Sequence, residues 1–342
     1  MSKNDDAWDM FFNHTNTLNE INKSQYAFVK ADALKKIGQR EPRLMTKIDT
    51  LEVRPEIFKD KHLSILPVKN GEYLIFKDRD QRSYYCFDNF LEKIPIRLHK
   101  PICNLDDFDS YPGEERMNEA QAIDFAFISS IIKTFTEETK MWLTIRGRQF
   151  TGCFSFIIPS IKKEIEIKSV QIEIDAGYES QNKIYLFEAK IGRRSNFNIR
   201  QLYYPYLEWK QRSEKEIIPI LFFNTNGLNY LFQFQFGETF NDIQLSKYAC
   251  FSLDETLVTH AKLKSVLANS AYKENEPIEY PFPQADDMDK VIDTISLISQ
   301  GYDDKTQISE ELEFDERQGD YYGNAGCYLG FLEHEDGKVD DE

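Results

Sequence analysis

Three charged residues in the segment 171–190 have the types and the spacing that a catalytic site needs: Asp175, Glu188 and Lys190. The segment reads QIEIDAGYESQNKIYLFEAK, in which alternating apolar runs flank a turn, and this pattern predicts a half-buried β-hairpin. A turn that is symmetric about 181–182 places Asp175 opposite Glu188, and Lys190 then joins the same face. Because opposed carboxylates repel each other, the pair predicts a bridging divalent metal ion.

The segments around the hairpin predict a mixed sheet with flanking helices. An apolar stripe over 118–139 predicts a helix before the hairpin, and 197–210 predicts a second helix after it, bent or restarted at Pro205. The apolar run 217–223 predicts a buried strand, and 228–236 predicts a further strand near an edge. The resulting order is helix, three strands, helix and strand, which indicates an α/β or α+β protein.

The sequence Ile174-Asp175 followed by Glu188-Ala189-Lys190 resembles the motif of the PD-(D/E)XK nuclease superfamily, with Ile174 where the motif has a proline. The wider layout is similar to that of a type II restriction endonuclease. This resemblance implies a restriction-endonuclease-like mixed β-sheet core flanked by helices. It also implies Mg²⁺, for which Mn²⁺ can substitute, held by the carboxylates of Asp175 and Glu188 and the backbone carbonyl of Ala189.

The resemblance also assigns roles to three further side chains. Lys190 would orient or deprotonate the attacking water and stabilise the negative charge that develops on the phosphate. Gln201 matches the Gln or Arg that many members carry on the following helix, where it contacts the active site or the phosphate. Glu119 is either a further metal ligand or an acid that favours the first turn of its helix.

The charge of the chain is unevenly distributed, which matters for any nucleic-acid partner. The net charge is -16, and an acidic protein repels a polyanion. Residues 131–225, however, contain 15 Lys or Arg against 11 Asp or Glu, so this segment is basic. The candidate DNA-contacting residues here are five arginines, of which the first two are either phosphate clamps or solvated residues at a strand end: Arg146, Arg148, Arg193, Arg194 and Arg200.

The chain is expected to form three units. Residues 1–113 predict an N-terminal α+β domain for docking or DNA contact, 114–274 the nuclease core, and 284–342 a domain that resembles a winged helix and has an acidic tail. Arg317 and Gln318 are candidate base-reading residues of this last domain. Its many acidic residues leave dimerisation or packing as alternative roles.

Several classes of protein are disfavoured by composition. No apolar run approaches the ~20 residues of a membrane span, and the start of the chain lacks a signal-peptide core, so a cytoplasmic protein without a membrane partner is expected. The 5 Cys are scattered and the 5 His have no paired spacing, which disfavours disulfides and zinc. The leading hypothesis is a homodimeric, Mg²⁺-dependent, sequence-specific endonuclease of double-stranded DNA. The alternatives are a repair, structure-specific or RNA-directed nuclease of the same fold, and a non-catalytic DNA-binding regulator.

Overall fold

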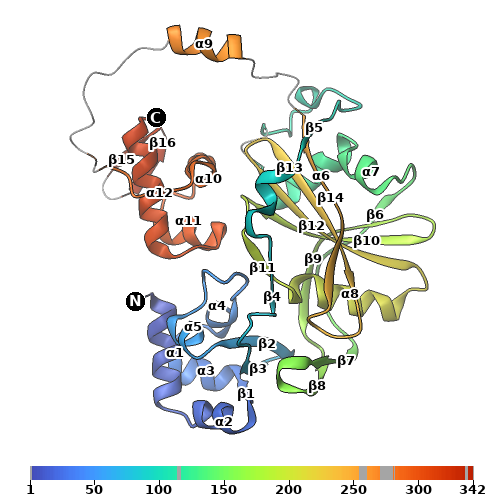
Figure 1. Ribbon diagram of the computed structural model, residues 1–342, viewed down its shortest axis with the longest axis vertical. Helices are drawn as coiled ribbons and strands as arrows, with labels where there is room; N and C mark the ends of the chain where they lie inside the picture. Colours follow the sequence, from blue (N-terminus) through green and yellow to red (C-terminus); the bar gives the residue numbers. More distant parts are fainter. Residues whose placement is uncertain are drawn as a thin grey trace.

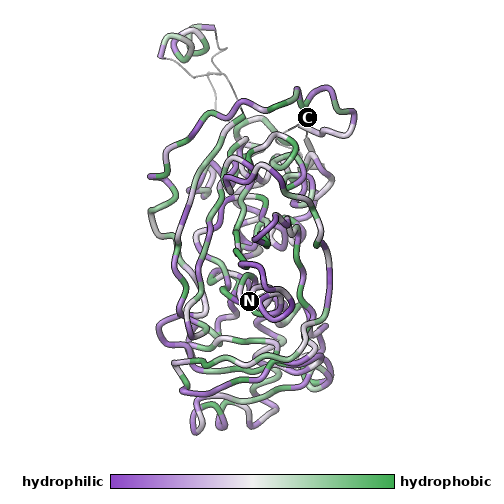
Figure 2. The backbone as a smooth tube through the Cα atoms, turned by 90° about the vertical axis from the view of Figure 1, so that its right-hand side faces the viewer, coloured by the Kyte–Doolittle hydropathy of each residue, from purple (hydrophilic) through white to green (hydrophobic). Residues whose placement is uncertain are grey.

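The protein is mixed α/β, with two large sheets and helices packed against them (Figure 1). The computed structural model describes residues 2–113, 117–253, 260–269, 280, 282–335 and 338–341. Figure 2 shows the backbone from the side, with hydrophobic and hydrophilic residues both distributed along its length. Among the described residues, no helix combines the length and the apolar character needed to cross a membrane.

The larger sheet has seven strands and carries the hairpin that the sequence predicts. Its order is β5 (Ile96–Leu98), β14 (Ile243–Ser252), β13 (Leu228–Phe236), β12 (Glu216–Thr225), β10 (Lys183–Ile191), β9 (Gln171–Glu179) and β6 (Trp142–Phe150). Strand β10 is antiparallel to β9 and parallel to β12, and β14 is parallel to β5, so the sheet is mixed. Strand β13 pairs with both β12 and β14 and is the third strand from the β5 edge, so the predicted strand exists near an edge but is not itself the edge strand.

Helices cover both faces of this sheet at β10, which explains why that strand is apolar almost throughout. On one face, Tyr185, Phe187 and Ala189 share a core with α6 (Glu119–Ile128) and α7 (Ile131–Thr136). On the other face, Ile184 and Leu186 pack with Tyr206 and Trp209 of α8 (Arg200–Arg212). Even-numbered residues of β10 therefore point toward α8, and this alternation continues to Glu188 and Lys190.

Two predicted helices differ from their expected form. The segment 118–139 is divided into α6 and α7, because Ser130 adopts a left-handed conformation with φ 71. By contrast, α8 runs through Pro205 as one continuous helix, so the expected restart at this proline does not occur.

The smaller sheet has five strands drawn from two distant parts of the chain. Its order is β1 (Tyr26–Lys30), β3 (Glu72–Lys77), β2 (Leu63–Lys69), β8 (Lys163–Lys168) and β7 (Cys153–Ile158). The residues Leu66, Phe76, Phe156 and Ile165 belong to one core cluster, so both parts fold together. The expected boundary at residue 113 therefore does not separate the two sheets.

Five short helices pack on the N-terminal strands: α1 (Lys3–Asn13), α2 (Thr17–Ser24), α3 (Ala31–Gly38), α4 (Pro42–Thr46) and α5 (Glu56–Asp60). Trp8, Phe11, Phe12 and Phe58 form the aromatic centre of this region. The sequence predicts a helix from residue 26 onward, but 26–30 form β1, which pairs with β3. Small connecting elements complete the main body: β4 (Tyr84–Cys86), β11 (Asn196–Asn198), and 3-10 helices Asp88–Lys93, Leu105–Asp107 and Pro159–Ile161.

The C-terminal unit has its own hydrophobic core, formed around Val291, Ile308, Phe314 and Tyr322. It consists of α10 (Met288–Ser299), α11 (Lys305–Leu312), α12 (Glu316–Leu329), β15 (Leu332–Glu335) and β16 (Lys338–Asp341). The expected order of three helices and a hairpin is confirmed, while the expected hairpin turn at 336–337 lies outside the described residues. Helix α9 (His260–Asn269) lies in the segment that connects this unit to β14.

Candidate active site

The register of the β9–β10 hairpin brings Asp175 and Glu188 to the same place. Ala176 pairs with Phe187 and Glu179 pairs with Ile184, so the centre of the turn is where the sequence predicts it. The paired ladder ends at Ala176 and Phe187, one residue before Asp175 and Glu188 would face each other. The prediction that the two carboxylates share one end of the hairpin is confirmed.

At Asp175, a side-chain hydrogen bond takes the place of the backbone hydrogen bond that would continue the β9–β10 ladder. The backbone N–H of Ala189 donates a hydrogen bond to Asp175 Oδ2 at 2.7 Å. On its other side, β9 shifts register against β6 between Ile145 and Gly147, and such an irregularity re-aims nearby side chains. The strands therefore separate at Asp175, and its carboxylate is held in the opening.

Lys190 lies between acidic side chains from three elements. Its Nζ is 2.9 Å from Glu188 Oε1, 3.7 Å from Glu119 Oε1 and 3.9 Å from Glu313 Oε1. Lys190 and Glu188 are each only 8% exposed. Glu119 is the first residue of α6, which Asn118 caps through its side chain, so the cap fixes the direction from which Glu119 approaches.

Gln201 reaches the same carboxylate from the opposite side. Because it lies in the first turn of α8, its Nε2 can donate to Glu188 Oε1, at 2.7 Å. Its Oε1 is buried and has no hydrogen-bond partner among the described residues. An unsatisfied buried acceptor is costly, and it marks a place where a water or substrate donor would bind favourably.

All five predicted catalytic side chains line one cavity of about 410 Å³ between β9, β10, α6 and α8: Glu119, Asp175, Glu188, Lys190 and Gln201. Lys47 and Asp49, from the loop after α4, and the predicted DNA-contacting residues Arg148 and Arg200 also line it. The structure therefore brings together residues that the sequence separates by more than one element.

Burial controls the protonation of this cluster. Burial raises the pKa of Asp175 to about 6 and that of Glu188 to about 8, although Lys190 acts in the opposite direction on both. For Lys190, burial alone would lower the pKa, but Glu188, Glu119, Glu313 and Asp175 together hold it well above its ordinary value. In the absence of a second cation, burial therefore favours the protonated form of Glu188 near neutral pH, beside a charged lysine.

The donor set is compatible with a hard cation. Within the described ranges, no cluster of three or more His, Cys, Asp or Glu side chains is placed to hold a metal ion. A site here would use two carboxylates, and Mg²⁺ usually keeps several waters and needs one or two carboxylates from the protein. Asp175 Oδ1 and Glu188 Oε2 accept no hydrogen bond from any described residue, so each carboxylate has one oxygen available.

The arginines that the sequence assigns to DNA contact do not form one free cationic surface. Each of them is paired with a carboxylate: Arg146 with Asp124, Arg148 with Glu173, Arg193 with Asp287 and Asp289, Arg194 with Glu313, Arg200 with Asp49, and Arg317 with Asp315. Arg317 and Gln318 lie on α12, away from the residues that line the cavity.

Two acidic residues next to the site were missed by the sequence analysis. Glu313 follows α11 and lies against Lys190, and the carboxylate of Asp49 accepts a hydrogen bond from Arg200 Nη2 at 2.8 Å. No motif or periodicity singles out either residue. Both reach the site through folding over long sequence distances, so only the tertiary structure reveals them.

Three protein-family models match parts of the chain. A model described as a domain of unknown function (DUF6997) matches residues 82–252, half of the chain. The chain belongs to the DUF6997 family. Two further domains of unknown function flank this match, DUF6996 over 5–75 and DUF7226 over 290–341. No curated protein and no solved structure matches the chain.

The DUF6997 segment contains every predicted catalytic residue, from Glu119 to Gln201. Asp49 lies in the DUF6996 segment and Glu313 in the DUF7226 segment. In this DUF6997 protein, Asp49 therefore lines the cavity together with the acids of the DUF6997 segment, and Glu313 lies against the lysine of the cavity.

A pH-dependent effect is expected at the contact between α10 and the DUF6997 sheet. Burial raises the pKa of Asp293 to about 7, against the hydrogen bond from Thr225 and the charge of Arg194. Because the unfolded carboxyl titrates near pH ~4, the unfolding free energy falls as pH rises from about 4 to about 7. Asp293→Asn should remove this slope. The difference in unfolding free energy between the variant and the wild type should therefore favour the variant more at pH 8 than at pH 5, by more than about 1 kcal/mol.

Urea denaturation at the two pH values, followed by circular dichroism, measures this effect. The matched control is Asp80→Asn, since Asp80 is exposed. An Asp293→Asn protein with the same pH slope as the wild type would show that this carboxyl does not cause it.

Proposed function

We propose that this protein is a metal-dependent endonuclease that hydrolyses DNA phosphodiester bonds, of the type II restriction kind. The observation that carries the proposal is the convergence of Asp175, Glu188, Lys190 and Gln201 on one polar cavity. The succession α6, β6, β9, β10, α8, β12, with β10 parallel to β12, supports a restriction-endonuclease-like core. The order of elements in the C-terminal unit supports a winged-helix-like architecture.

The proposed metal ligands are the free oxygens of Asp175 and Glu188, together with the backbone carbonyl of Ala189. Bound there, Mg²⁺ would neutralise charge on the phosphate and lower the pKa of a coordinated water. The hydrogen bonds that Gln201 and the Ala189 N–H donate fix the orientation of the two carboxylates. This leaves one oxygen of each carboxylate without a hydrogen bond from a described residue, and these two oxygens would be available to a cation.

Lys190 is proposed to act on the attacking water and on the phosphate. While Glu188 is 2.9 Å away, the lysine stays protonated and stabilises negative charge in the transition state. When a cation takes over the charge of Glu188 and Asp175, the main influence that raises the Lys190 pKa weakens. The lysine can then orient the water and take its proton.

The proposed substrate is double-stranded DNA, cut by a cytoplasmic homodimer, because cleavage of two antiparallel strands suits two catalytic centres related by a two-fold axis. Arg148 and Arg200 line the cavity and support phosphate binding, provided that DNA displaces Glu173 and Asp49 from them. The basic composition of 131–225 supports the same substrate.

Incubation of the full chain with phage DNA in the presence of Mg²⁺ tests the proposal. Discrete fragments that vanish when EDTA is added are the expected result, and Mn²⁺ should substitute for Mg²⁺. A smear would instead support a nuclease without sequence specificity. DNA that is bound but stays intact with either metal would contradict nuclease activity and favour a DNA-binding regulator.

A further inference from the structure

The C-terminal unit (288–341) covers the side of the proposed active site that carries its most basic loop. In Figure 1 this unit lies beside the seven-stranded sheet and next to the N-terminal helices. The covered loop follows β10 and contains Gly192, Arg193 and Arg194. Both arginines are among the residues that the sequence assigns to DNA contact, so the unit occupies part of the surface where DNA is expected.

Glu313 makes the central contact. One of its carboxylate oxygens lies 3.9 Å from Lys190 Nζ and the other 3.5 Å from Arg194 Nε. Glu313 is 8% exposed and has a left-handed backbone conformation with φ 55, which non-glycine residues seldom adopt. Its backbone is held from the N-terminal region, since Thr50 Oγ1 donates to the Glu313 carbonyl at 3.1 Å.

The loop arginines are also held by other groups of the same unit. Arg194 Nη2 donates to the backbone carbonyl of Glu311 at 2.8 Å. Arg193 lies 3.3 Å from Asp289 and 3.8 Å from Asp287, which begin or precede α10. Every guanidinium of the loop is therefore neutralised by the C-terminal unit.

The arrangement of charges resembles that expected for a bound phosphate backbone. A nuclease of this design needs cations beside the scissile phosphate, and a DNA duplex presents about one negative charge per 1.7 Å of its axis. Here the carboxylates of Glu313, Asp289 and Asp287 form ion pairs with basic side chains that would otherwise be available to phosphates. Incoming DNA would meet these acids at short range, and like charges repel.

The unit also closes the space in front of the metal-binding carboxylates. A cavity of about 330 Å³ is lined on one side by Glu119, Glu173 and Asp175, and on the other by residues of the C-terminal unit, among them Leu297, Tyr302 and Glu311. This volume is that of a small-molecule pocket, whereas a duplex needs an open groove. DNA and the C-terminal unit cannot both occupy this place.

We propose that the C-terminal unit is an autoinhibitory module, which holds Glu313 on Lys190 and Arg194 and keeps DNA out of the active site. The inference rests on the proposed nuclease function and concerns the regulation of the same site. The module must leave for DNA to bind. Its contact with the core consists largely of ion pairs and polar hydrogen bonds, and such contacts are more easily exchanged for solvent or for another charged partner than apolar packing.

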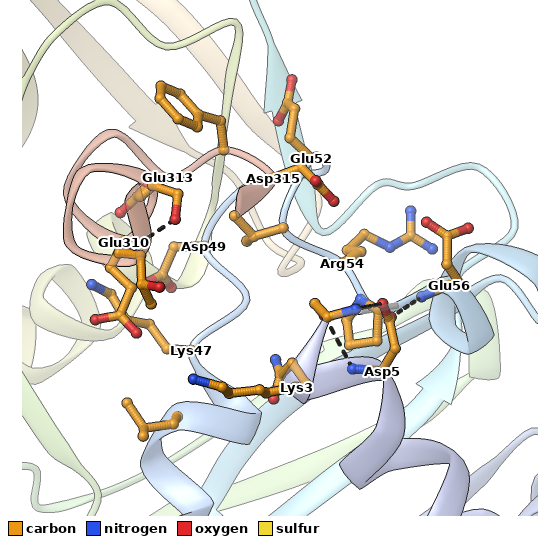
Figure 3. A pocket seen from close by; sticks show the side chains of 18 of the residues that line it. Lys3, Asp5, Lys47, Asp49, Glu52, Arg54, Glu56, Glu310, Glu313 and Asp315 are labelled. Carbon is orange, nitrogen blue, oxygen red and sulfur yellow. Dashed lines mark hydrogen bonds between the residues drawn. The ribbon is translucent and has the colours of Figure 1, made fainter. Parts of the chain in front are cut away.

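Two features of the structure permit this departure. A second cavity, of about 210 Å³, lies beside Glu313, between the C-terminal unit and the N-terminal region (Figure 3). Figure 3 shows Glu310, Glu313 and Asp315 facing the N-terminal side chains Lys47 and Arg54 across this cavity. The unit also has its own core, which shares no buried residue with the cores of the two sheets, so it can separate as a folded body.

The test measures DNA binding by the full chain in EDTA, where no metal-dependent cleavage occurs, with a fluorescent duplex and anisotropy as the readout. If the closed arrangement prevails about ten to one, its loss tightens the apparent Kd by about tenfold. Glu313→Gln keeps the size of the side chain and removes its charge, so it should show this gain. Asp289→Asn, at the far end of the contact, should tighten binding in the same direction.

The matched control is Glu310→Gln, because Glu310 lies on the same helix, is exposed and forms no ion pair with a described residue. It removes the same charge from the unit and should leave the Kd at the wild-type value. Equal gains for Glu310→Gln and Glu313→Gln would mean that general charge matters and would overturn the specific contact.

Cleavage of plasmid DNA with Mg²⁺ separates this inference from the function on which it rests. Faster cleavage by Glu313→Gln than by the wild type supports both. Slower cleavage without tighter binding would assign Glu313 to the catalytic or structural framework and overturn autoinhibition, while the nuclease stands. If no protein cleaves with Mg²⁺ or Mn²⁺ but Glu313→Gln still binds DNA more tightly, the contact blocks a DNA-binding site and the nuclease proposal alone fails.

Discussion

Lys190→Ala should lower the rate of Mg²⁺-dependent DNA cleavage by at least about 100-fold, the range expected when a group that positions or transfers a proton is lost. Lys190 is the cation of the site, 2.9 Å from Glu188, and no other described lysine or arginine lies within ion-pair distance of that carboxylate. DNA binding should survive, since Arg148 and Arg200 remain at the cavity. Plasmid cleavage and anisotropy measure the two properties separately.

Two further variants make this result interpretable. Lys190→Arg keeps the positive charge, but a guanidinium does not lose its proton in proteins. If proton transfer is the main role, Lys190→Arg is nearly as inactive as Lys190→Ala; if charge stabilisation is, it keeps a substantial part of the rate. Lys168→Ala, at an exposed position of β8, is the control for a general loss of charge. Unchanged cleavage by Lys190→Ala would remove Lys190 from the mechanism.

Mg²⁺ should raise the Tm of the wild-type protein, and Asp175→Asn should abolish most of this stabilisation together with cleavage. A ligand at about 100 times its Kd stabilises the folded state by ~2.7 kcal/mol, which corresponds to roughly 4 °C for a chain of this size. The physical reason is the burial of Asp175 and Glu188, whose raised pKa values show that their charged forms lack a sufficient counter-charge. A bound cation supplies it.

Differential scanning fluorimetry across a Mg²⁺ titration measures the effect. Without Mg²⁺, Asp175→Asn should melt no lower than the wild type, because the amide oxygen can still accept the Ala189 N–H and one buried charge is removed. Asp106→Asn, an exposed acid of a loop helix, should keep the full Mg²⁺ response. A metal-induced shift that persists in Asp175→Asn would place the cation elsewhere.

The position of the reactive side chains could be predicted from the sequence because it depends on local rules. A tight hairpin fixes its own register, so the sequence could predict that Asp175, Glu188 and Lys190 lie close together, and all three line one cavity. The approach of Gln201 depends on the start of a helix only a few residues later. Geometry that depends only on residues close in sequence can be predicted without knowledge of the rest of the fold.

The surroundings of the site could not be predicted, because they depend on contacts between distant segments. Thr50 and Glu313 are separated by 263 positions, yet they meet beside Lys190. The loop arginines are basic in sequence but paired in structure, since the acids that bind Arg193 and Arg194 come from the C-terminal unit. Counting charges in one sequence segment indicates whether that segment can attract a polyanion. It does not reveal acidic residues elsewhere in the chain that already pair with its basic residues.

Local propensity also failed where tertiary packing decides. Residues 26–30 continue a helical pattern in sequence, but β3 offers them a strand partner and they become β1. The sequence analysis did not predict strand β14. Exposed and half-buried residues alternate along its first half, and only its last four residues are buried. In both cases the neighbour in space, which the sequence does not identify, determines the conformation.

The five-stranded sheet determines how the chain can be divided for experiments. Strands β7 and β8 complete a sheet that β1, β2 and β3 begin, and Tyr203 and Tyr204 of α8 pack into the same core. A fragment restricted to 82–252 would leave β8 as an open edge with its apolar face uncovered, which favours aggregation. The N-terminal region is thus a structural part of the body that carries the candidate site, whereas the C-terminal unit has a separate core and is the part suited to expression on its own.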